Sequence, residues 1–596
     1  MGVIAGQVQL VPLDPAWPGE RNGLDLRSAD RRWLVAFSGR IDNRVEFATR
    51  FGLNSRLADG VLAAEAIAVS GVTALGDALG DFAFVAWDTR ERRLWLGRDA
   101  IGFRPLFYVH EDDSVRFSTE LRGLARRTDG YSVLSVRPVN EGYLAELLAG
   151  TIVSVAETPF AGVRRALPAE ALVFECGKPV RRVTLWRPPN VLPPRRRDDD
   201  LIAEFRERFV AAVARSVGGE EVSTQLSGGL DSTSVTAAVA SITRRAPDAY
   251  SLVYPSVPVA LNGEMLDESA YIDAAVAAIG SRSVRFDPLG PAGLQRADFL
   301  RVMTAHGDVP DFPVTDALNY ALFTRAVADG HRVMLTGLGG DYWLTGSLSR
   351  LPALIRHGKW IDAWRFSRDA RRLDTLEATA GQIRAHLLSR LAPHWLKVIY
   401  RRTPPPRVWP SWLPDAFTTR VHLGARLRRM SDRVPQVDDE VLQDSLMTLS
   451  LAGSLLARES VFRAANDAGI DVRHPMLDRQ FVEFVMTLPD DLRMRGHETR
   501  YIVRRALGDW LPPMIRQRRS KGDGSTVIAA AASMLLGGRA SIDGHAAARG
   551  WIDPAVLWPR LQQLSRGDFR AHMPAEGDDH LWFAVAAETW LAERGA

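Results

Sequence analysis

Short apolar runs, each followed by a polar turn, dominate the first third of the chain. They occupy residues 82–87, 94–96, 106–109 and 115–117, and charged turns lie between the members of each pair. Aromatic and β-branched runs at this spacing are typical of antiparallel β-hairpins. We therefore predict a β-rich N-terminal domain.

The pattern changes at the end of this region. Residues 187–197 are rich in Pro and Arg and cannot sustain a helix, which indicates a linker. Asp198–Asp200 follow as candidate N-cap residues. Apolar residues then recur at helical spacing, at Ile202, Phe205, Phe209, Val213 and Val217. We predict a first domain over residues 1–187, a linker over 188–200 and a second domain over 201–596.

Strands and helices alternate beyond the linker. Strand candidates occupy residues 222–226, 250–254, 284–286 and 333–336, and helical segments separate them. This alternation predicts a parallel sheet in an α/β fold. From about residue 350 the pattern is mostly helical.

Composition narrows the class of protein. A chain of 596 residues with 46% hydrophobic and 24% charged residues is typical of a globular protein of two or three domains. A net charge of +4 is a weak signal for nucleic acid or membrane. The single cysteine, Cys176, excludes an internal disulfide and fits a reducing compartment. The N-terminus shows no signal peptide, and the apolar stretch Val527–Leu536 is too short to span a bilayer. We expect a cytoplasmic enzyme without a nucleic-acid or membrane partner.

A glycine-rich turn between a predicted strand and a predicted helix carries the main chemical signal. Ser227–Ser232 reads Ser-Gly-Gly-Leu-Asp-Ser. Two adjacent glycines let several backbone N–H groups point at one anion, and the helix N-terminus and two hydroxyls add to the attraction. No Gly-Lys-Ser/Thr follows, so this is not a Walker A loop. Asp231 inside an anion site implies a cation, and Mg²⁺ on a pyrophosphate is the candidate.

The Ser-Gly-Gly-Leu-Asp-Ser turn resembles the pyrophosphate loop of the N-type ATP pyrophosphatases. Thr336–Asp341 (Thr-Gly-Leu-Gly-Gly-Asp) resembles the second loop of asparagine synthetases, and Arg473–Asp478 resembles another stretch of that family. We interpret the helix after it as structural, with His474 packed or hydrogen-bonded. Leu511–Gly522 resembles the family segment that ends in a catalytic lysine, here Lys521.

The resemblance implies the cofactors and most of the site. ATP and Mg²⁺ are expected, with Asp231 and Asp341 as metal ligands and Lys521 as a catalytic residue. The expected nucleotide-binding residues are Leu226, Ser227, Gly228, Gly229, Leu230, Asp231, Ser232, Val253, Thr336, Gly337 and Gly340. The implied fold is a glutaminase-like αββα (Ntn-type) domain followed by a doubly wound, adenine nucleotide alpha hydrolase-like domain with helical additions.

The N-terminal resemblance lacks one residue. Asparagine synthetases begin Met-Cys-Gly-Ile, whereas this chain begins Met1-Gly2-Val3-Ile4. The cysteine is the nucleophile that releases ammonia from glutamine. Other pieces of that domain persist, at residues 39–43, 80–84, 98–106 and 117–120. We expect an inactive glutaminase domain, and we do not expect Cys176 to replace the missing thiol.

β-Lactam synthetases and lasso-peptide macrolactam synthetases resemble asparagine synthetase in this way and use an amine of the substrate itself. Leu338 stands where asparagine synthetases have glutamate and β-lactam synthetases have tyrosine. Glu459 matches the β-lactam glutamate that handles the amine, although an Arg–Glu pair on a helix surface explains it equally well. The insertion over 349–440 holds Trp360, Trp364, Trp395, Trp409 and Trp412, which would suit a peptide.

The lasso-peptide cyclase is the reading that these features favour. The substrate would be a precursor peptide whose Asp or Glu side chain is adenylated and then joined to the peptide's N-terminal amine. A leader peptidase and a leader-binding protein are the further partners that this reading implies. The alternatives are an ammonia-dependent asparagine synthetase, a β-lactam synthetase, and an inactive scaffold that only binds nucleotide.

Overall fold

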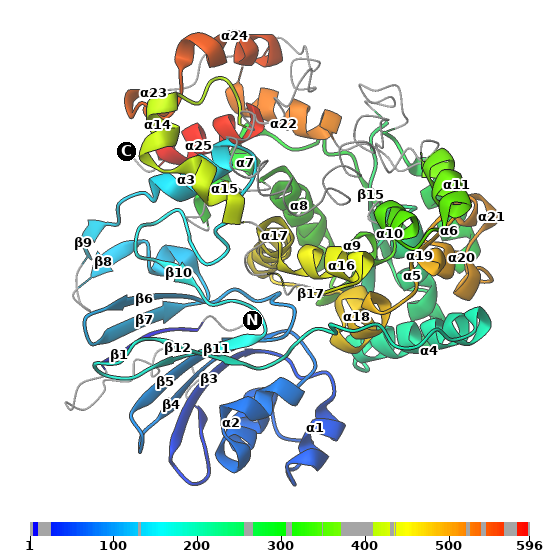
Figure 1. Cartoon of the computed structure of the whole chain (residues 1–596), viewed down its shortest axis with the longest axis horizontal. Helices are drawn as coiled ribbons and strands as arrows, with labels where there is room; N and C mark the ends of the chain where they lie inside the picture. The colour runs from blue at the N-terminus through cyan, green and yellow to red at the C-terminus, as the bar shows by residue number, and fades with distance from the viewer. Residues whose placement is uncertain are drawn as a thin grey trace.

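The computed structural model describes residues 4–9, 26–128, 133–255, 266–305, 313–347, 350–370, 409–429, 434, 437–496, 498–519, 525–537, 544–565 and 581–593. Figure 1 shows two parts: antiparallel strands in blue and cyan with helices beside them, and a larger, mainly helical part in green to red. The two parts lie against each other along a long junction.

The N-terminal part contains two antiparallel sheets. The larger sheet has six strands, in the order β12 (Arg181–Thr184), β11 (Glu170–Phe174), β5 (Arg93–Arg98), β4 (Phe82–Asp88), β3 (Trp33–Gly39) and β2 (Leu26–Arg27). The smaller sheet has four, in the order β1 (Ala5–Gln9), β7 (Ser114–Ser118), β6 (Phe107–Glu111) and β10 (Arg164–Arg165). A separate ribbon pairs β8 (Arg126–Thr128) with β9 (Val133–Val136). The predicted hairpins are confirmed, because β4 pairs with β5 and β6 pairs with β7.

Helices cover the outer faces of this sandwich. Apolar residues from both sheets, such as Val85 and Phe117, pack together in the layer between them. The other face of the larger sheet packs against α2 (Asp59–Ser70), with α1 (Arg44–Arg50) beside it. The other face of the smaller sheet packs against α3 (Glu141–Leu148). The resulting order of layers is the predicted αββα arrangement.

The second part is built on a parallel sheet of five strands. Their order is β15 (Ser283–Phe286), β14 (Ala249–Leu252), β13 (Ser223–Gln225), β16 (Val333–Leu335) and β17 (Asp471–Arg473). Every neighbouring pair is parallel. The chain starts in the centre at β13, runs outward to β15 and then crosses to β16. The topological switch point therefore lies between β13 and β16, where open α/β sheets bind ligands.

Helices surround this sheet and fill the rest of the chain. Those nearest the sheet are α4 (Asp198–Val217), α5 (Leu230–Thr243), α6 (Ser269–Ile279), α7 (Arg296–Ala305), α8 (Pro313–Ala328), α9 (Gly340–Trp343), α16 (Glu440–Ser450), α17 (Ala452–Ala468) and α18 (Arg479–Met486). The others are α10 (Arg350–Arg356), α11 (Trp360–Ala370), α14 (Asp415–Arg420), α15 (Leu423–Arg428), α19 (Asp490–Arg493), α20 (Tyr501–Ala506), α21 (Pro513–Arg516), α22 (Ser525–Leu536), α23 (His545–Ala548), α24 (Pro554–Ser565) and α25 (Leu581–Glu593). A short ribbon pairs β18 (Met494–Arg495) with β19 (Glu498–Thr499).

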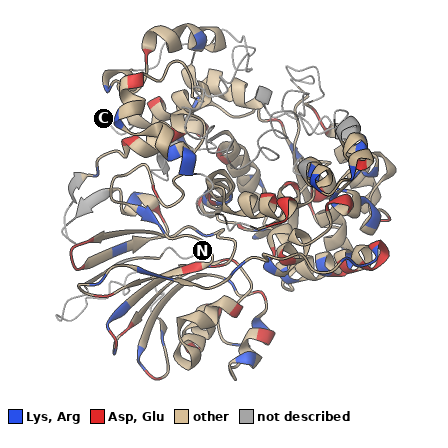
Figure 2. Cartoon of the chain, viewed as in Figure 1, with Lys and Arg blue, Asp and Glu red and all other residues tan. Residues whose placement is uncertain are grey.

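The hydropathy of the helices and the distribution of charged residues were also compared with the sequence prediction. Among the described residues, none of the helices has the length and hydropathy that a membrane crossing requires. Positions of both charge signs are interspersed along the ribbons in the view of Figure 2.

The structure differs from the sequence prediction at one element boundary and in one strand. α4 begins at Asp198, inside the segment that we assign to the linker, and its N-cap is Arg197. Asp198–Asp200 therefore lie in the first helical turn, where carboxylates stabilise the positive end of the helix dipole. The prediction also misses β17, because a strand that reads Asp-Val-Arg has only one apolar residue.

Candidate nucleotide site at the switch point

Two loops meet at the carboxyl ends of β13 and β16. Gly228 has a φ of +73°, a conformation that glycine adopts without strain. Gly337 lies so close to the first loop that a Cβ there would be 2.6 Å from the backbone nitrogen of Ser232. The first loop runs into α5 and the second into α9. Both predicted loops thus form one site, and glycine is what permits their close approach.

Hydroxyl groups organise the first loop. The Ser227 and Ser232 Oγ atoms lie 3.0 Å apart, and the Ser227 backbone N–H donates to Ser232 Oγ at 3.1 Å. Ser227 itself is exposed at the mouth of the loop. An exposed hydroxyl beside the N-terminus of a 14-residue helix is a suitable donor for a phosphate oxygen.

Apolar residues of the predicted nucleotide site lie behind this loop. Leu226, Leu230 and Val253 are buried in one cluster, which also includes Leu511 and Ile515 of the segment before Lys521. Lys521 lies outside the described residues.

The two predicted metal ligands come together in the structure. Asp231 is buried, and its Oδ1 has no hydrogen-bond partner within the described part of the chain. Asp341 is partly exposed, and a Cβ on the neighbouring Gly340 would collide with the Asp231 carboxylate. Arg500 lies between them, forming an ion pair with Asp341 Oδ1 and another with Asp231 Oδ2 at 3.3 Å.

This donor set fits Mg²⁺. An unpartnered buried carboxylate oxygen beside a second carboxylate is what a hard cation with oxygen ligands needs. Among the described residues, no group of three or more potential His, Cys, Asp or Glu ligands exists, so substrate phosphate and water would complete the coordination.

Arginines that sequence reasoning missed hold the site together. Arg500 has a φ of +54° at the start of α20, which turns its side chain toward the carboxylates. Arg518 donates to the Gly228 carbonyl at 3.3 Å and stacks over the Tyr271 ring at 4.0 Å. Arg504 donates to the carbonyl of Arg518 at 2.7 Å. In a chain with many arginines, one-dimensional spacing does not separate these from solvated ones.

Glu459 is not at the nucleotide loops but at the domain junction. It is 0% exposed, and its two carboxylate oxygens accept hydrogen bonds from Arg98 at 2.8 Å and from Arg165 at 3.0 Å. Burial opposes ionisation, but Arg165, Arg98 and Arg463 outweigh it and lower the pKa of Glu459. The interpretation as a helix-surface pair is therefore wrong. Glu459 thus joins the two domains through Arg98 and Arg165, and its assignment to the amine stays a prediction.

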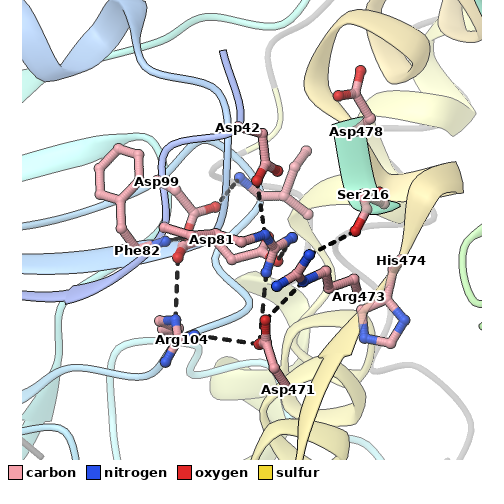
Figure 3. A network of polar contacts seen from close by, with 12 residues as sticks. Asp42, Asp81, Phe82, Asp99, Arg104, Ser216, Asp471, Arg473, His474 and Asp478 are labelled. Carbon is pink, nitrogen blue, oxygen red and sulfur yellow. Dashed lines mark hydrogen bonds and ion pairs between the residues drawn. The ribbon is translucent and has the colours of Figure 1, made fainter. Parts of the chain in front are cut away.

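A second polar network crosses the junction next to the site (Figure 3). Arg40 and Arg104 of the N-terminal domain lie 3.8 Å and 3.6 Å from Asp471 Oδ1 at the start of β17. Arg473, at the end of β17, donates to Asp471 Oδ2 at 2.7 Å. Burial raises the pKa of Asp42, a member of the same network, to about 6.

This junction is linked to the second nucleotide loop through His474. The imidazole Nδ1 and Thr336 Oγ1 are 2.6 Å apart, and Thr336 Oγ1 accepts the backbone N–H of Leu338 at 3.1 Å. Phe103 of the N-terminal domain packs edge-on against His474 at 4.5 Å between ring centroids. Burial lowers the pKa of His474 to about 4. His474 is packed and hydrogen-bonded, as predicted.

Cys176 and the insertion tryptophans have ordinary surroundings. Cys176 is exposed next to β11, and its thiol lies 3.5 Å from Asp113 Oδ1, a contact that raises the pKa of the thiol. Trp412 is a fully buried core residue rather than a peptide contact, and Trp409 packs against the same cluster. Trp360 and Trp364 are exposed on α11. Trp395 lies outside the described residues.

Comparison with known sequences defines the class. A sequence model of the asparagine synthase family matches residues 204–592, and one of the glutamine amidotransferase domain matches residues 9–183. The chain belongs to the asparagine synthase family.

Individual relatives are distant. Asparagine synthetase 3 (glutamine-hydrolyzing) of Bacillus subtilis is 25% identical over 464 residues, which cover 74% of this chain and 66% of that protein. Amidase chyE of Penicillium rubens is 25% identical over 285 residues, covering 46% of this chain and 41% of that protein. The chain thus spans just under two thirds of the first relative and less than half of the second. A solved glutamine phosphoribosylpyrophosphate amidotransferase from B. subtilis has a TM-score of 0.19 and 14% identity, covering 53% of this chain and 63% of that one.

Proposed function

We propose that this chain is a macrolactam synthetase that uses ATP to activate a carboxylate of a peptide and closes a ring with the peptide's own amine. The observation that carries the proposal is the absence of a usable thiol in the glutaminase-like domain. The single cysteine of this sequence is Cys176. Asp113 raises the pKa of that thiol, which opposes formation of the nucleophilic thiolate. Glutamine is then not the nitrogen source.

The proposed reaction has two steps. A substrate carboxylate oxygen bonds to the α-phosphorus of ATP, and pyrophosphate leaves. An amine then attacks the activated carbonyl carbon, AMP leaves with its bonding electrons, and the ammonium loses a proton. Bound Mg²⁺ would neutralise charge on the phosphate oxygens. Ser227 and Ser232 would bind those oxygens, while Asp231 and Asp341 would hold the cation.

The domain junction supports an amine that does not come through the N-terminal domain. Glu459 and Arg98 are fully buried there, and Phe103 packs against Phe462 at 5.8 Å between ring centroids. Side chains therefore fill the part of the junction around Glu459 and Phe103. An amine already attached to the substrate needs no passage, and its effective molarity favours ring closure.

The test is AMP and pyrophosphate release from ATP·Mg²⁺ with three substrate sets in parallel. These are aspartate with ammonium, aspartate with glutamine, and a precursor peptide with an Asp or Glu several residues into its core, with the leader peptidase added. We expect AMP release only with the peptide, together with a product lighter by one water. Turnover with glutamine would contradict the proposal, because it would show that glutamine is the nitrogen source.

An ammonia-dependent asparagine synthetase is the second candidate, because the B. subtilis relative is named an asparagine synthetase. Turnover confined to aspartate with ammonium would establish it. In that case Leu338, which has no group to orient a small amine, would have no part in selecting the substrate.

A further inference from the structure

The loop after β5 places two apolar side chains of the N-terminal domain in the core of the second domain. These are Ile101 and Phe103, and both are buried. Ile101 packs in an apolar cluster that includes Leu335 of β16. Phe103 packs in another cluster, which includes Met334 of the same strand. Successive residues of a strand point to opposite faces of a sheet, so the loop contributes to the core on both faces.

Hydrogen bonds fix the backbone of this loop to the N-terminal sheet. Asp99 Oδ1 accepts the backbone N–H groups of Ile101 at 2.9 Å and of Gly102 at 2.7 Å. The other oxygen, Oδ2, accepts the backbone N–H of Phe82 in β4 at 3.1 Å (Figure 3). The Gly102 carbonyl accepts Arg98 Nη2 at 2.7 Å. The N-terminal domain therefore determines where the two apolar side chains lie.

The second nucleotide loop begins directly beside these clusters. Thr336 follows the last residue of β16, and its Oγ1 accepts the backbone N–H of Leu338 at 3.1 Å. Such a side-chain turn fixes the backbone between the two residues. The Leu338 side chain packs against both clusters. The conformation of the loop thus depends on the core to which Ile101 and Phe103 contribute.

His474 connects Phe103 to the same loop. Its Nδ1 lies 2.6 Å from Thr336 Oγ1. The Phe103 ring lies edge-on against the imidazole, with 4.5 Å between the ring centroids. Because His474 is buried in close-packed surroundings, the Phe103 ring restricts where the imidazole can lie. A smaller side chain at position 103 would leave space for the imidazole to move away from Thr336.

We propose that Ile101 and Phe103 are positioning residues for ATP, which hold the second nucleotide loop against the first. The glutaminase-like domain then contributes to nucleotide binding without any nucleophile of its own. The loops tolerate little displacement, because a Cβ on Gly337 would be 2.6 Å from the backbone nitrogen of Ser232. This inference goes beyond the proposed function, since it holds whichever carboxylate and amine the enzyme joins.

The first experiment compares two buried phenylalanines of the N-terminal domain. The Kd for ATP·Mg²⁺ is measured on the full chain with N-methylanthraniloyl-ATP, below the Tm of each variant. Phe103→Leu raises the Kd about tenfold, because the second loop loses its fixed position. Phe47→Leu is the matched control, since Phe47 is buried in the cluster between α2 and the larger sheet. Its Tm falls, but its Kd stays within about twofold of the wild type.

The comparison contradicts the proposal in either of two cases. An unchanged Kd in Phe103→Leu would show that the loop does not depend on this side chain. An equal rise in Phe103→Leu and Phe47→Leu would show that any loss of stability in the N-terminal domain weakens nucleotide binding.

The second experiment tests whether Phe103 acts through the loop. Thr336→Val removes the hydroxyl with little change of shape and raises the Kd for ATP·Mg²⁺ about three- to tenfold. In the double variant with Phe103→Leu, the Kd rises by less than the product of the two single effects, because both changes break the same connection. A rise equal to that product would show independent actions and overturn the proposal.

ATP–pyrophosphate exchange separates this proposal from the proposed function. If the wild type shows no exchange with any peptide while Phe103→Leu still raises the Kd for ATP·Mg²⁺, the macrolactam function fails and the positioning role is supported. If peptide-dependent exchange occurs with the same KM for ATP in the wild type and in Phe103→Leu, the macrolactam function is supported and the positioning role is overturned.

Discussion

Two arginine–carboxylate clusters in this chain have opposite characters. At the switch point, Arg500 bridges Asp231 and Asp341, yet Asp231 Oδ1 meets no partner among the residues that the structure describes. At the domain junction, Arg98 and Arg165 occupy both oxygens of Glu459, which is completely buried. We call the first the open cluster, because one carboxylate oxygen has no partner among the described residues. We call the second the closed cluster, because both carboxylate oxygens accept hydrogen bonds from arginine.

This difference shows how to distinguish a ligand-binding site from a structural ion pair. A carboxylate with spare oxygens beside glycine-rich loops can exchange its cation for a ligand. A carboxylate whose oxygens are all taken in a dry interior cannot do so without leaving charges uncompensated. Both clusters consist of the same two residue types, so only their hydrogen-bond completeness and exposure distinguish them.

The largest expected effect lies in the closed cluster. Glu459→Gln leaves Arg98 and Arg165 without a counter-charge, so the free energy of unfolding should fall by about 3–5 kcal/mol. Urea denaturation followed by fluorescence measures this. Glu221→Gln is the control, because its partner Arg245 and Glu221 itself are 76% and 67% exposed. We expect no resolvable change there.

Exchange activity gives the other half of this test. Below its Tm, Glu459→Gln should retain ATP–pyrophosphate exchange within about threefold, since the carboxylate does not touch the nucleotide loops. Loss of exchange in a folded Glu459→Gln protein would show that the closed cluster takes part in chemistry.

The open cluster should respond in the reverse way. Asp231→Asn should lower ATP–pyrophosphate exchange about 10³-fold, because charge on the departing pyrophosphate loses its metal ligand. The Tm of the ligand-free protein should stay within about 2 °C of the wild type, because Oδ1 has no partner among the described residues and Arg500, the ion-pair partner of Oδ2, keeps its pair with Asp341. Exchange within tenfold of the wild type would remove Asp231 from the metal site.

The sequence alone predicts the open cluster and misses the closed one, for a physical reason. The loops around Asp231 and Asp341 are contiguous motifs, and their glycines indicate a conformational requirement of the backbone at those positions. The pairing of Glu459 with Arg98 joins residues 361 positions apart, and nothing in either neighbourhood encodes it.

The same reasoning explains the fold. Alternating apolar runs predict β4, β5, β13 and β16, because their burial follows from local pattern. β17 escapes prediction because its outer residues do not fill the core: Asp471 makes an ion pair across the junction, and Arg473 pairs with Glu220 of its own domain. Arg500 escapes for the same reason, since its role depends on two loops that are distant in sequence.

A pH experiment tests whether the junction is as dry as its burial implies. His474 has its pKa lowered to about 4 by burial, against an ordinary value near 6.5. The unfolded chain therefore binds more protons between these values, and stability rises with pH across the window, by about 3 kcal/mol. Above pH 6.5 the contribution is constant.

The measurement is the difference in unfolding free energy between wild type and His474→Gln from pH 4 to pH 8. The difference is needed because Asp42 and Asp99, with pKa values raised to about 6, contribute with the opposite sign. A difference that does not depend on pH would mean that His474 is solvated.

The smallest expected effect concerns Arg500, whose guanidinium lies between the two carboxylates of the open cluster. Arg500→Gln removes the guanidinium that lies 3.3 Å from Asp231 Oδ2. Because that charge repels a metal ion, the Kd for Mn²⁺ without nucleotide, measured by electron paramagnetic resonance, should tighten by roughly three- to tenfold. Adding Asp231→Asn should abolish the gain, which locates it at this carboxylate. Arg165→Gln makes the equivalent change in the closed cluster and should create no Mn²⁺ site, because Glu459 stays buried and bound to Arg98. A tighter Kd for Mn²⁺ in Arg165→Gln, or an unchanged Kd in Arg500→Gln, would contradict the distinction between the open and the closed cluster.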